Sequence, residues 1–110
     1  MPPIYLDYNA TTPIDPAVAE AMQPYIAKHY GNPSSAHEYG RTTKNAVEGA
    51  RQQVAALLGC TPEEIIFTGG GSESNNNVLK GVAYTYRHQG NHLITSAVEH
   101  PAIINPCRFL

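Results

Sequence analysis

Long apolar runs, clustered basic residues and cysteines are all scarce in this 110-residue sequence. The longest uninterrupted apolar stretch is about five residues, at 54–58, whereas a membrane-spanning helix needs about 20. The first residues also lack the basic region that precedes the apolar core of a signal peptide. We therefore expect a soluble, cytoplasmic protein that makes no membrane contact.

The seven Lys and Arg residues are spread along the chain, and the formal net charge is −2. A nucleic-acid-binding surface needs a continuous basic patch to neutralise phosphates, so nucleic acid is not an expected partner. With 42% hydrophobic and 15% charged residues, the composition is that of an ordered chain with room for one modest core. The length sets one domain as the upper limit.

The cysteine and histidine residues do not form the patterns typical of a disulfide framework or a metal site. Cys60 and Cys107 are too few for the disulfide framework of a small secreted domain, so both are expected as reduced thiols. His88 and His92 are four residues apart, but Gly90 interrupts the helix that could place both rings on one face. No metal site is expected.

Apolar residues that recur every three or four positions predict helices, and short apolar runs bounded by turn residues predict strands. We expect helices at 16–28, 37–58 and 72–88, with a last one beginning near Pro101. We expect strands at 65–68 and 91–95 and a short extended segment at 4–8. A strand, a glycine turn, a helix and a second strand form a βαβ unit, which implies a parallel sheet. The expected fold class is therefore α/β.

Three consecutive glycines, Gly69 to Gly71, join an expected strand to an expected helix. Bare backbone can approach a ligand closely, and the first N–H groups of a helix have no intrahelical partner. With the positive end of the helix dipole behind them, these groups form an anion site suited to a phosphate at Gly71 and Ser72. The alternative is a tight turn in which Ser72 caps the helix and the dipole favours Glu73. The spacing alone leaves both interpretations open.

Four motifs in the same order give the chain a family resemblance. They are YLDYNATTP at 5–13, GNPSS at 31–35 with His37 and Gly40, FTGGGSESNN at 67–76, and TSAVEH at 95–100. They are distributed from residue 5 to residue 100, along nearly the whole chain, and together they resemble the N-terminal third of a cysteine desulfurase. That family belongs to the class-V aminotransferase group of fold-type I pyridoxal-phosphate enzymes. The resemblance implies an extended N-terminal segment at 1–15 and, at 16–110, part of the large α/β domain that binds pyridoxal 5′-phosphate, with an incomplete parallel sheet.

The resemblance also implies roles for individual residues. Gly71 and Ser72 match the two positions that bind the cofactor phosphate, and His100 matches the histidine that stacks on the pyridine ring and assists proton transfers. A histidine in this place can instead cap the helix that begins at Pro101, and that is the alternative for His100. Glu73 matches a position that is acidic in the family, which its favourable place in the helix dipole also explains.

The activity implied by the resemblance is removal of sulfur from L-cysteine, which gives L-alanine and a persulfide on the enzyme. Such sulfur serves iron–sulfur cluster assembly or tRNA thiolation. The implied partners are L-cysteine, a second subunit in a homodimer and sulfur-acceptor scaffold proteins.

Three family features are missing from the 110 residues. The family holds its cofactor as a Schiff base on a lysine after a Ser-x-His run, sets an aspartate against the pyridine nitrogen, and uses a mobile-loop cysteine as nucleophile. Lys80 corresponds to an ordinary helix position in the family. The resemblance implies a nucleophile far beyond residue 110, so Cys107 is expected to be a small buried or half-buried residue instead. No catalytic residue is therefore assigned, and the chain is expected to be a fragment or truncated product that is inactive alone.

Two classes of function stay open at this point. The first is a portion of a cysteine desulfurase, with a selenocysteine lyase as a related alternative because it shares these early motifs. The second is a non-catalytic remnant that binds a phosphate-bearing ligand or a full-length partner. Whether the isolated chain is an enzyme depends on whether the missing lysine and cysteine are supplied.

Overall fold

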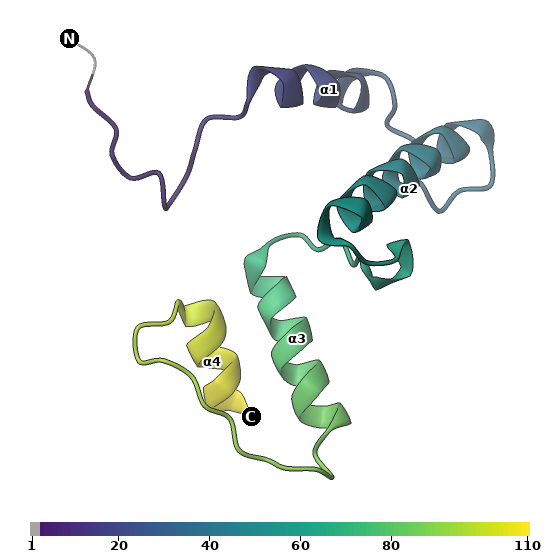
Figure 1. Cartoon of the computed structure of the whole chain (residues 1–110). Helices are drawn as coiled ribbons and strands as arrows, with labels where there is room; N and C mark the ends of the chain where they lie inside the picture. Colours follow the sequence, from purple (N-terminus) through teal and green to yellow (C-terminus); the bar gives the residue numbers. More distant parts are fainter. Residues whose placement is uncertain (1–2) are drawn as a thin grey trace. The chain divides into compact units, whose positions relative to one another are not determined.

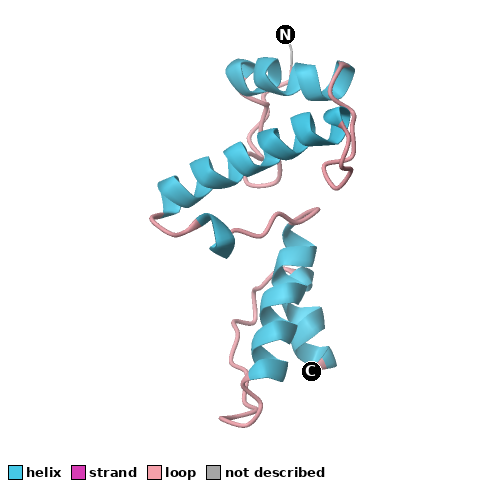
Figure 2. Ribbon diagram, turned by 90° about the vertical axis from the view of Figure 1, so that its right-hand side faces the viewer, coloured by secondary structure: helices cyan, strands magenta, loops and turns pink. Residues whose placement is uncertain are grey.

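A computed structural model describes residues 3–110, and in that range the chain consists of helices joined by loops (Figures 1 and 2). The elements are α1 (Pro16–Ala27), α2 (Glu38–Leu58), the short 3-10 turn η1 (Pro62–Glu64), α3 (Gly71–Thr85) and α4 (Pro101–Phe109). The chain divides into two compact units, the first ending at Ile65 and the second comprising Ile66–Leu110.

The N-terminal segment precedes the first helix. Of the expected range 1–15, residues 1–2 lie outside the described residues. The Tyr5 hydroxyl donates to the Asp7 carbonyl at 2.9 Å and lies 2.8 Å from the Thr11 hydroxyl, and the Ala10 N–H donates to the same Asp7 carbonyl at 3.0 Å. These bonds form a polar turn directly after the segment at 4–8 that was expected to be extended.

Helix α1 begins at the position that its capping residues predict. The Asp15 carboxylate accepts a hydrogen bond from the Ala17 N–H at 2.8 Å, and Pro16 occupies the first helical position, where a missing N–H costs nothing. The helix expected at 16–28 is confirmed to within one residue at its end. No residue of α1 is buried, so its apolar side chains stay accessible within the first unit.

Helix α2 is the longest element described, with 21 residues. The His37 imidazole accepts from the Gly40 N–H at 3.4 Å at its start, and Gly59 ends it in the left-handed conformation, with φ at 70°. Only glycine adopts that conformation without steric cost, which is why it ends so many helices. The helix expected at 37–58 is confirmed.

Gly40 and Thr43 of α2 are buried where the loop at 31–35 meets the helix. The buried Thr43 hydroxyl donates to the Gly31 carbonyl at 2.7 Å and lies 3.0 Å from the Gly40 carbonyl. A β-carbon added at Gly40 would lie 2.7 Å from the Asn32 carbonyl oxygen and would also collide with the Ser35 carbonyl. Glycine at position 40 therefore lets the loop backbone lie directly on the helix.

The turn η1 is closed by its own side chains. The Thr61 N–H donates to the Glu64 carboxylate at 2.8 Å, and the Thr61 hydroxyl donates to the same oxygen at 3.1 Å. These bonds, the backbone one foremost, lower the pKa of Glu64 below its ordinary value of 4.5. The ionised carboxyl of Glu64 therefore favours the folded turn. This stabilisation is fully present at pH values above the ordinary pKa, and it is lost as the pH falls through the lowered pKa of the folded form. Arg51 of α2, which also pairs with Glu48, donates to the Ile65 carbonyl just beyond the turn.

The second unit is built around two packed helices. Helices α3 and α4 lie against each other, and the Lys80 ammonium lies 4.9 Å from the centre of the Phe109 ring. Pro106 is buried inside α4, and the helix continues past it to Phe109. The helix expected at 72–88 is confirmed but ends earlier, at Thr85, and the one expected near Pro101 begins there.

The expected strands do not form. Residues 65–68 and 91–95 are loops, and no strand occurs anywhere in residues 3–110 (Figure 2). A helix satisfies its backbone hydrogen bonds within one segment, whereas a strand depends on a neighbour, and two short parallel strands are too few to be stable alone. The parallel sheet of the expected α/β fold is therefore not observed in the described residues.

Candidate functional site

The start of α3 presents backbone N–H groups with nothing to cap them. Gly70 is the N-cap residue and has no side chain to donate or accept. The Ser74 N–H bonds the Gly70 carbonyl at 3.1 Å and begins the intrahelical ladder. The amides of Gly71, Ser72 and Glu73 precede that ladder and have no intrahelical acceptor. Of the two interpretations of the glycine turn, a capping role for Ser72 is not observed, because Gly70 holds the cap position.

Three side chains around the glycines hold the turn in shape. The Glu73 carboxylate accepts from the Gly69 N–H at 2.7 Å. The hydroxyls of Thr68 and Ser74 lie 2.6 Å apart, and the Ser74 hydroxyl also donates to the Gly70 carbonyl at 3.3 Å. These bonds involve both ends of the Gly69–Gly71 turn. The first turn of α3 has no side-chain cap.

His100 caps α4. Its Nδ1 atom accepts a hydrogen bond from the Ala102 N–H at 3.1 Å, and Pro101 follows as the first helical residue. The capping alternative considered for this histidine is therefore observed. It does not exclude a second role, because a neutral ring with Nδ1 as acceptor carries its proton on Nε2, and the ring itself is exposed.

Ser72 and His100 line the same cavity in the second unit. The cavity has a volume of about 440 Å³. Its lining comes from one face of α3 and from α4: Ser72, Asn76, Lys80, His100, Pro101, Ala102, Asn105, Pro106 and Phe109. Gly71, the third expected cofactor residue, adjoins Ser72 in the chain but does not line the cavity. The structure thus brings together the expected phosphate residue Ser72 and the expected ring-facing residue His100.

Two lining residues were missed by the sequence analysis. Asn76 and Lys80 follow Ser72 by four and eight positions, so the three side chains share one face of α3. The Asn76 amide donates to the Ser72 carbonyl at 2.9 Å. Lys80 is half-buried in this cavity. Helical spacing from Ser72 is the signal that could have found both.

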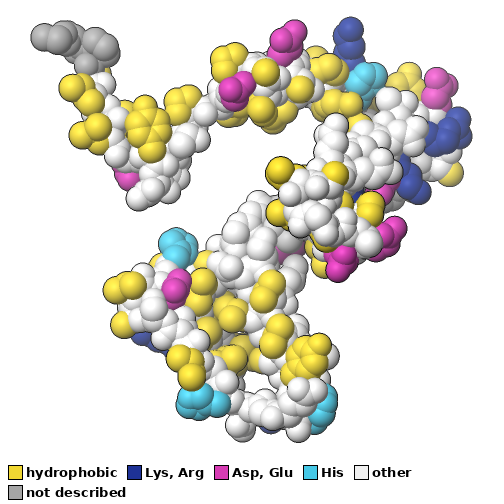
Figure 3. All heavy atoms as spheres, viewed as in Figure 1, with side chains coloured by type: hydrophobic (Ala, Val, Ile, Leu, Met, Phe, Trp, Pro, Cys, Tyr) yellow, Lys and Arg dark blue, Asp and Glu magenta, His cyan; other side chains and the backbone are white. Residues whose placement is uncertain are grey.

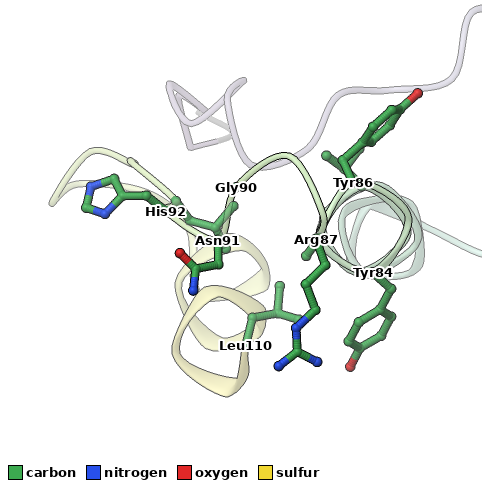
Figure 4. A pocket seen from close by; sticks show the side chains of 10 residues that line it. Tyr84, Tyr86, Arg87, Gly90, Asn91, His92 and Leu110 are labelled. Atoms are coloured by element: carbon green, nitrogen blue, oxygen red, sulfur yellow. The ribbon is translucent and has the colours of Figure 1, made fainter.

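A second cavity, of about 300 Å³, lies at the opposite end of α3 (Figure 4). The side chain of Arg87 extends toward Leu110, while Tyr86 points away from it. The residues expected to bind a cofactor do not line this cavity.

No group of three or more His, Cys, Asp or Glu side chains in residues 3–110 is arranged to hold a metal ion. No helix in the same range is both long enough and apolar enough to cross a membrane. Cys60 and Cys107 are free and half-buried.

The sequence of this chain matches that of a known protein family. Residues 4–110 match the model of the aminotransferase class-V family. The chain belongs to that family. Within it, the chain is 52% identical over 107 residues to the cysteine desulfurase IscS of Dictyoglomus turgidum and 53% identical over 109 residues to the cysteine desulfurase of Homo sapiens. The resemblance to cysteine desulfurases drawn from the four motifs is confirmed.

The match covers only part of each relative. It takes in 97% of this chain and 27% of the bacterial protein, and 98% of this chain and 24% of the human one. The chain thus spans about a quarter of the length of these relatives and corresponds to their N-terminal part. A solved structure described as a NifS-like protein superposes with a TM-score of 0.88 at 40% sequence identity, over 96% of this chain and 29% of that one.

The class-V family depends on pyridoxal phosphate, and the residues present fit that group. A phosphate needs N–H donors that no side chain already occupies, and the first turn of α3 offers them beside the Ser72 hydroxyl. The attached ring needs a cavity with a flat side chain at its edge, and His100 lines the cavity that begins at Ser72.

Proposed function

We propose that this chain is the N-terminal part of the cofactor-binding domain of a pyridoxal-phosphate-dependent cysteine desulfurase, with that domain beginning at residue 16. Similarity to the NifS-like structure over 96% of the chain supports the proposal. We further propose that segments 65–68 and 91–95 become neighbouring strands when the other strands of a parallel sheet are present, because each then gains a pairing partner.

The proposed site uses three residues. The amides around Gly71 and the Ser72 hydroxyl hold the cofactor phosphate, because uncapped N–H groups and a helix dipole favour a dianion. His100 faces the ring, held in place by its bond to the Ala102 N–H. When bound, pyridoxal phosphate supplies an electron sink that stabilises negative charge on the substrate carbon. The chain's own residues contribute binding and orientation.

The chemical steps of desulfuration need groups that these 110 residues do not supply. None of the three lysines at 28, 44 and 80 lies in the Ser-x-His context of the cofactor lysine, and Cys107 lies on α4 rather than in a loop. We propose that the chain alone does not convert L-cysteine to L-alanine. In the complete protein we propose L-cysteine as substrate, a homodimer as the assembly, scaffold proteins as sulfur acceptors for iron–sulfur or tRNA thiolation chemistry, and a cytoplasmic location.

The single observation that carries the proposal is that Ser72 and His100 share one cavity beside uncapped helix amides. It can be tested with pyridoxine 5′-phosphate, which has the ring and the phosphate ester but no aldehyde to react with lysines. We expect the chain to bind this compound more tightly than pyridoxine, measured by isothermal titration. Ser72→Ala should reduce that preference about tenfold or more, because it removes a hydrogen bond to a charged group.

Ser34→Ala is the matched control, since Ser34 is exposed and lies in the first unit. It should leave the preference unchanged. Equal affinity of the unmodified chain for pyridoxine and its phosphate would contradict the proposal.

A further inference from the structure

The carboxylate of Glu73 is bonded to an amide that lies outside its own helix. Its Oε2 atom accepts from the Gly69 N–H at 2.7 Å, one residue before the N-cap Gly70. A glutamate at this third helical position commonly reaches the N-cap amide itself, in the capping box. Glu73 reaches one residue further back.

The start of η1 shows the ordinary capping-box arrangement. At η1, Glu64 also stands three residues after its N-cap, and its carboxylate accepts from both the amide and the hydroxyl of Thr61. That helical start is closed by its own side chains. At α3, the N-cap Gly70 has no hydroxyl, and the glutamate is engaged elsewhere. The start of η1 is therefore capped by side chains, whereas the start of α3 is not.

The absence of a side chain at Gly69 gives the carboxylate this position. A β-carbon there would lie 3.3 Å from Oε2 of Glu73, which is tighter than most such contacts. The Thr68–Ser74 hydroxyl pair and the bond from Ser74 to the Gly70 carbonyl hold the other side of the turn. The Gly69–Gly71 turn is thus fixed from both ends before any ligand arrives.

We infer that Glu73 is a positioning residue for a phosphate-bearing ligand, an inference that rests on the proposed function. Its bond to Gly69 holds the backbone of the turn in the conformation in which the amides of Gly71 and Ser72 have no side-chain cap. The same bond engages the carboxylate outside the helix, where it does not compete with the phosphate for the helix amides. Glu73 does not touch the ligand and acts through the backbone.

Two substitutions separate the hydrogen bond from the charge. Glu73→Gln and Glu73→Ala both remove the negative charge, but only glutamine keeps an oxygen that can accept from Gly69. We expect the preference for pyridoxine 5′-phosphate over pyridoxine to be about three- to tenfold lower in the Ala variant than in the Gln variant. The Gln variant should match or exceed the unmodified chain, because a charge of the same sign as the phosphate is gone.

Glu63→Gln and Glu63→Ala form the control pair, since Glu63 is an exposed glutamate of η1 in the first unit. The two Glu63 variants should show the same preference for pyridoxine 5′-phosphate over pyridoxine. If the Ala and Gln variants of Glu73 show the same preference, or if the Ala variant loses only thermal stability, the inference is overturned while the phosphate site stands. If the unmodified chain shows no preference for the phosphate, the proposed function and this inference fail together.

Discussion

Gly40 and Thr43 show that single residues can determine local packing in a chain with few buried side chains. Thr43 is 7% exposed, and its hydroxyl is bonded to backbone carbonyls of both the helix and the loop at 31–35. The close approach that makes this possible requires a glycine at position 40. The loop is the GNPSS motif, so Gly40 and Thr43 help to hold this motif against α2.

We expect Gly40→Ala to destabilise the first unit by about 1–3 kcal/mol, because the added methyl group meets loop backbone that has no free space to move into. Urea unfolding followed by circular dichroism measures the change. Gly49→Ala is the control on the same helix, since a β-carbon there meets nothing within 4 Å. It should stabilise by up to about 1 kcal/mol through helix propensity. Equal effects at the two glycines would show that steric contact at Gly40 is not decisive.

Much of the candidate site could be predicted from the sequence at the level of residues. The three glycines before an expected helix indicated an anion site at Gly71 and Ser72, with a tight turn as the alternative, and the family resemblance assigned Ser72 and His100 to the cofactor. Both residues line one cavity, and His100 also caps α4. Asn76 and Lys80 were missed because a polar residue on a helix is normally solvated, and only the position of α4 makes their face part of a cavity.

At the scale of elements, most helix ends were predicted to within one residue, whereas α3 ends at Thr85, before the expected residue 88, and the expected strands do not form. Asp15 and Gly59 define helix ends through bonds and angles that lie within a few residues. A strand is different, because its hydrogen-bonding partner is remote in the sequence. The segment at 65–68 has the apolar and β-branched character of a buried strand, yet no described segment pairs with it.

The C-terminal end of α2 gives a test at this scale. Gly59→Ala should cost about 1 kcal/mol, because a side chain is unfavourable at a φ of 70°. Gly59→Asn should cost less, since asparagine tolerates this conformation better than alanine. Thermal unfolding of the two variants side by side measures the difference. If alanine and asparagine cost the same, left-handed geometry is not what places glycine here.

At the scale of the whole molecule, very few side chains are buried. Among the described residues, the buried apolar side chains are Ala55, at 2% exposure, and Pro106, whereas Leu57 and Val98 are 84% and 93% exposed. Hydrophobic side chains are accordingly visible on the surface of both units (Figure 3). Burial of apolar area is the main favourable term in folding, so the described contacts give each unit only marginal stability.

We expect amide hydrogen exchange to reflect this uneven burial. Amides of α2 near Thr43 and Ala55 should exchange more slowly than those of α1, which has no buried residue. Exchange followed by mass spectrometry of peptides from each helix measures the contrast. Gly40→Ala should remove the extra protection near Thr43 and leave the exchange of α1 unchanged. Protection of α1 as strong as that of α2 would contradict the expectation.

The uncapped first turn of α3 also makes buffer composition an experimental variable. Sulfate and inorganic phosphate carry the same kind of oxygen atoms as a phosphate ester, so under the proposed function we expect them to compete at millimolar concentration for the amides after Gly70. Purification in an amine buffer with chloride as the counterion keeps this helix start accessible to the compound under study.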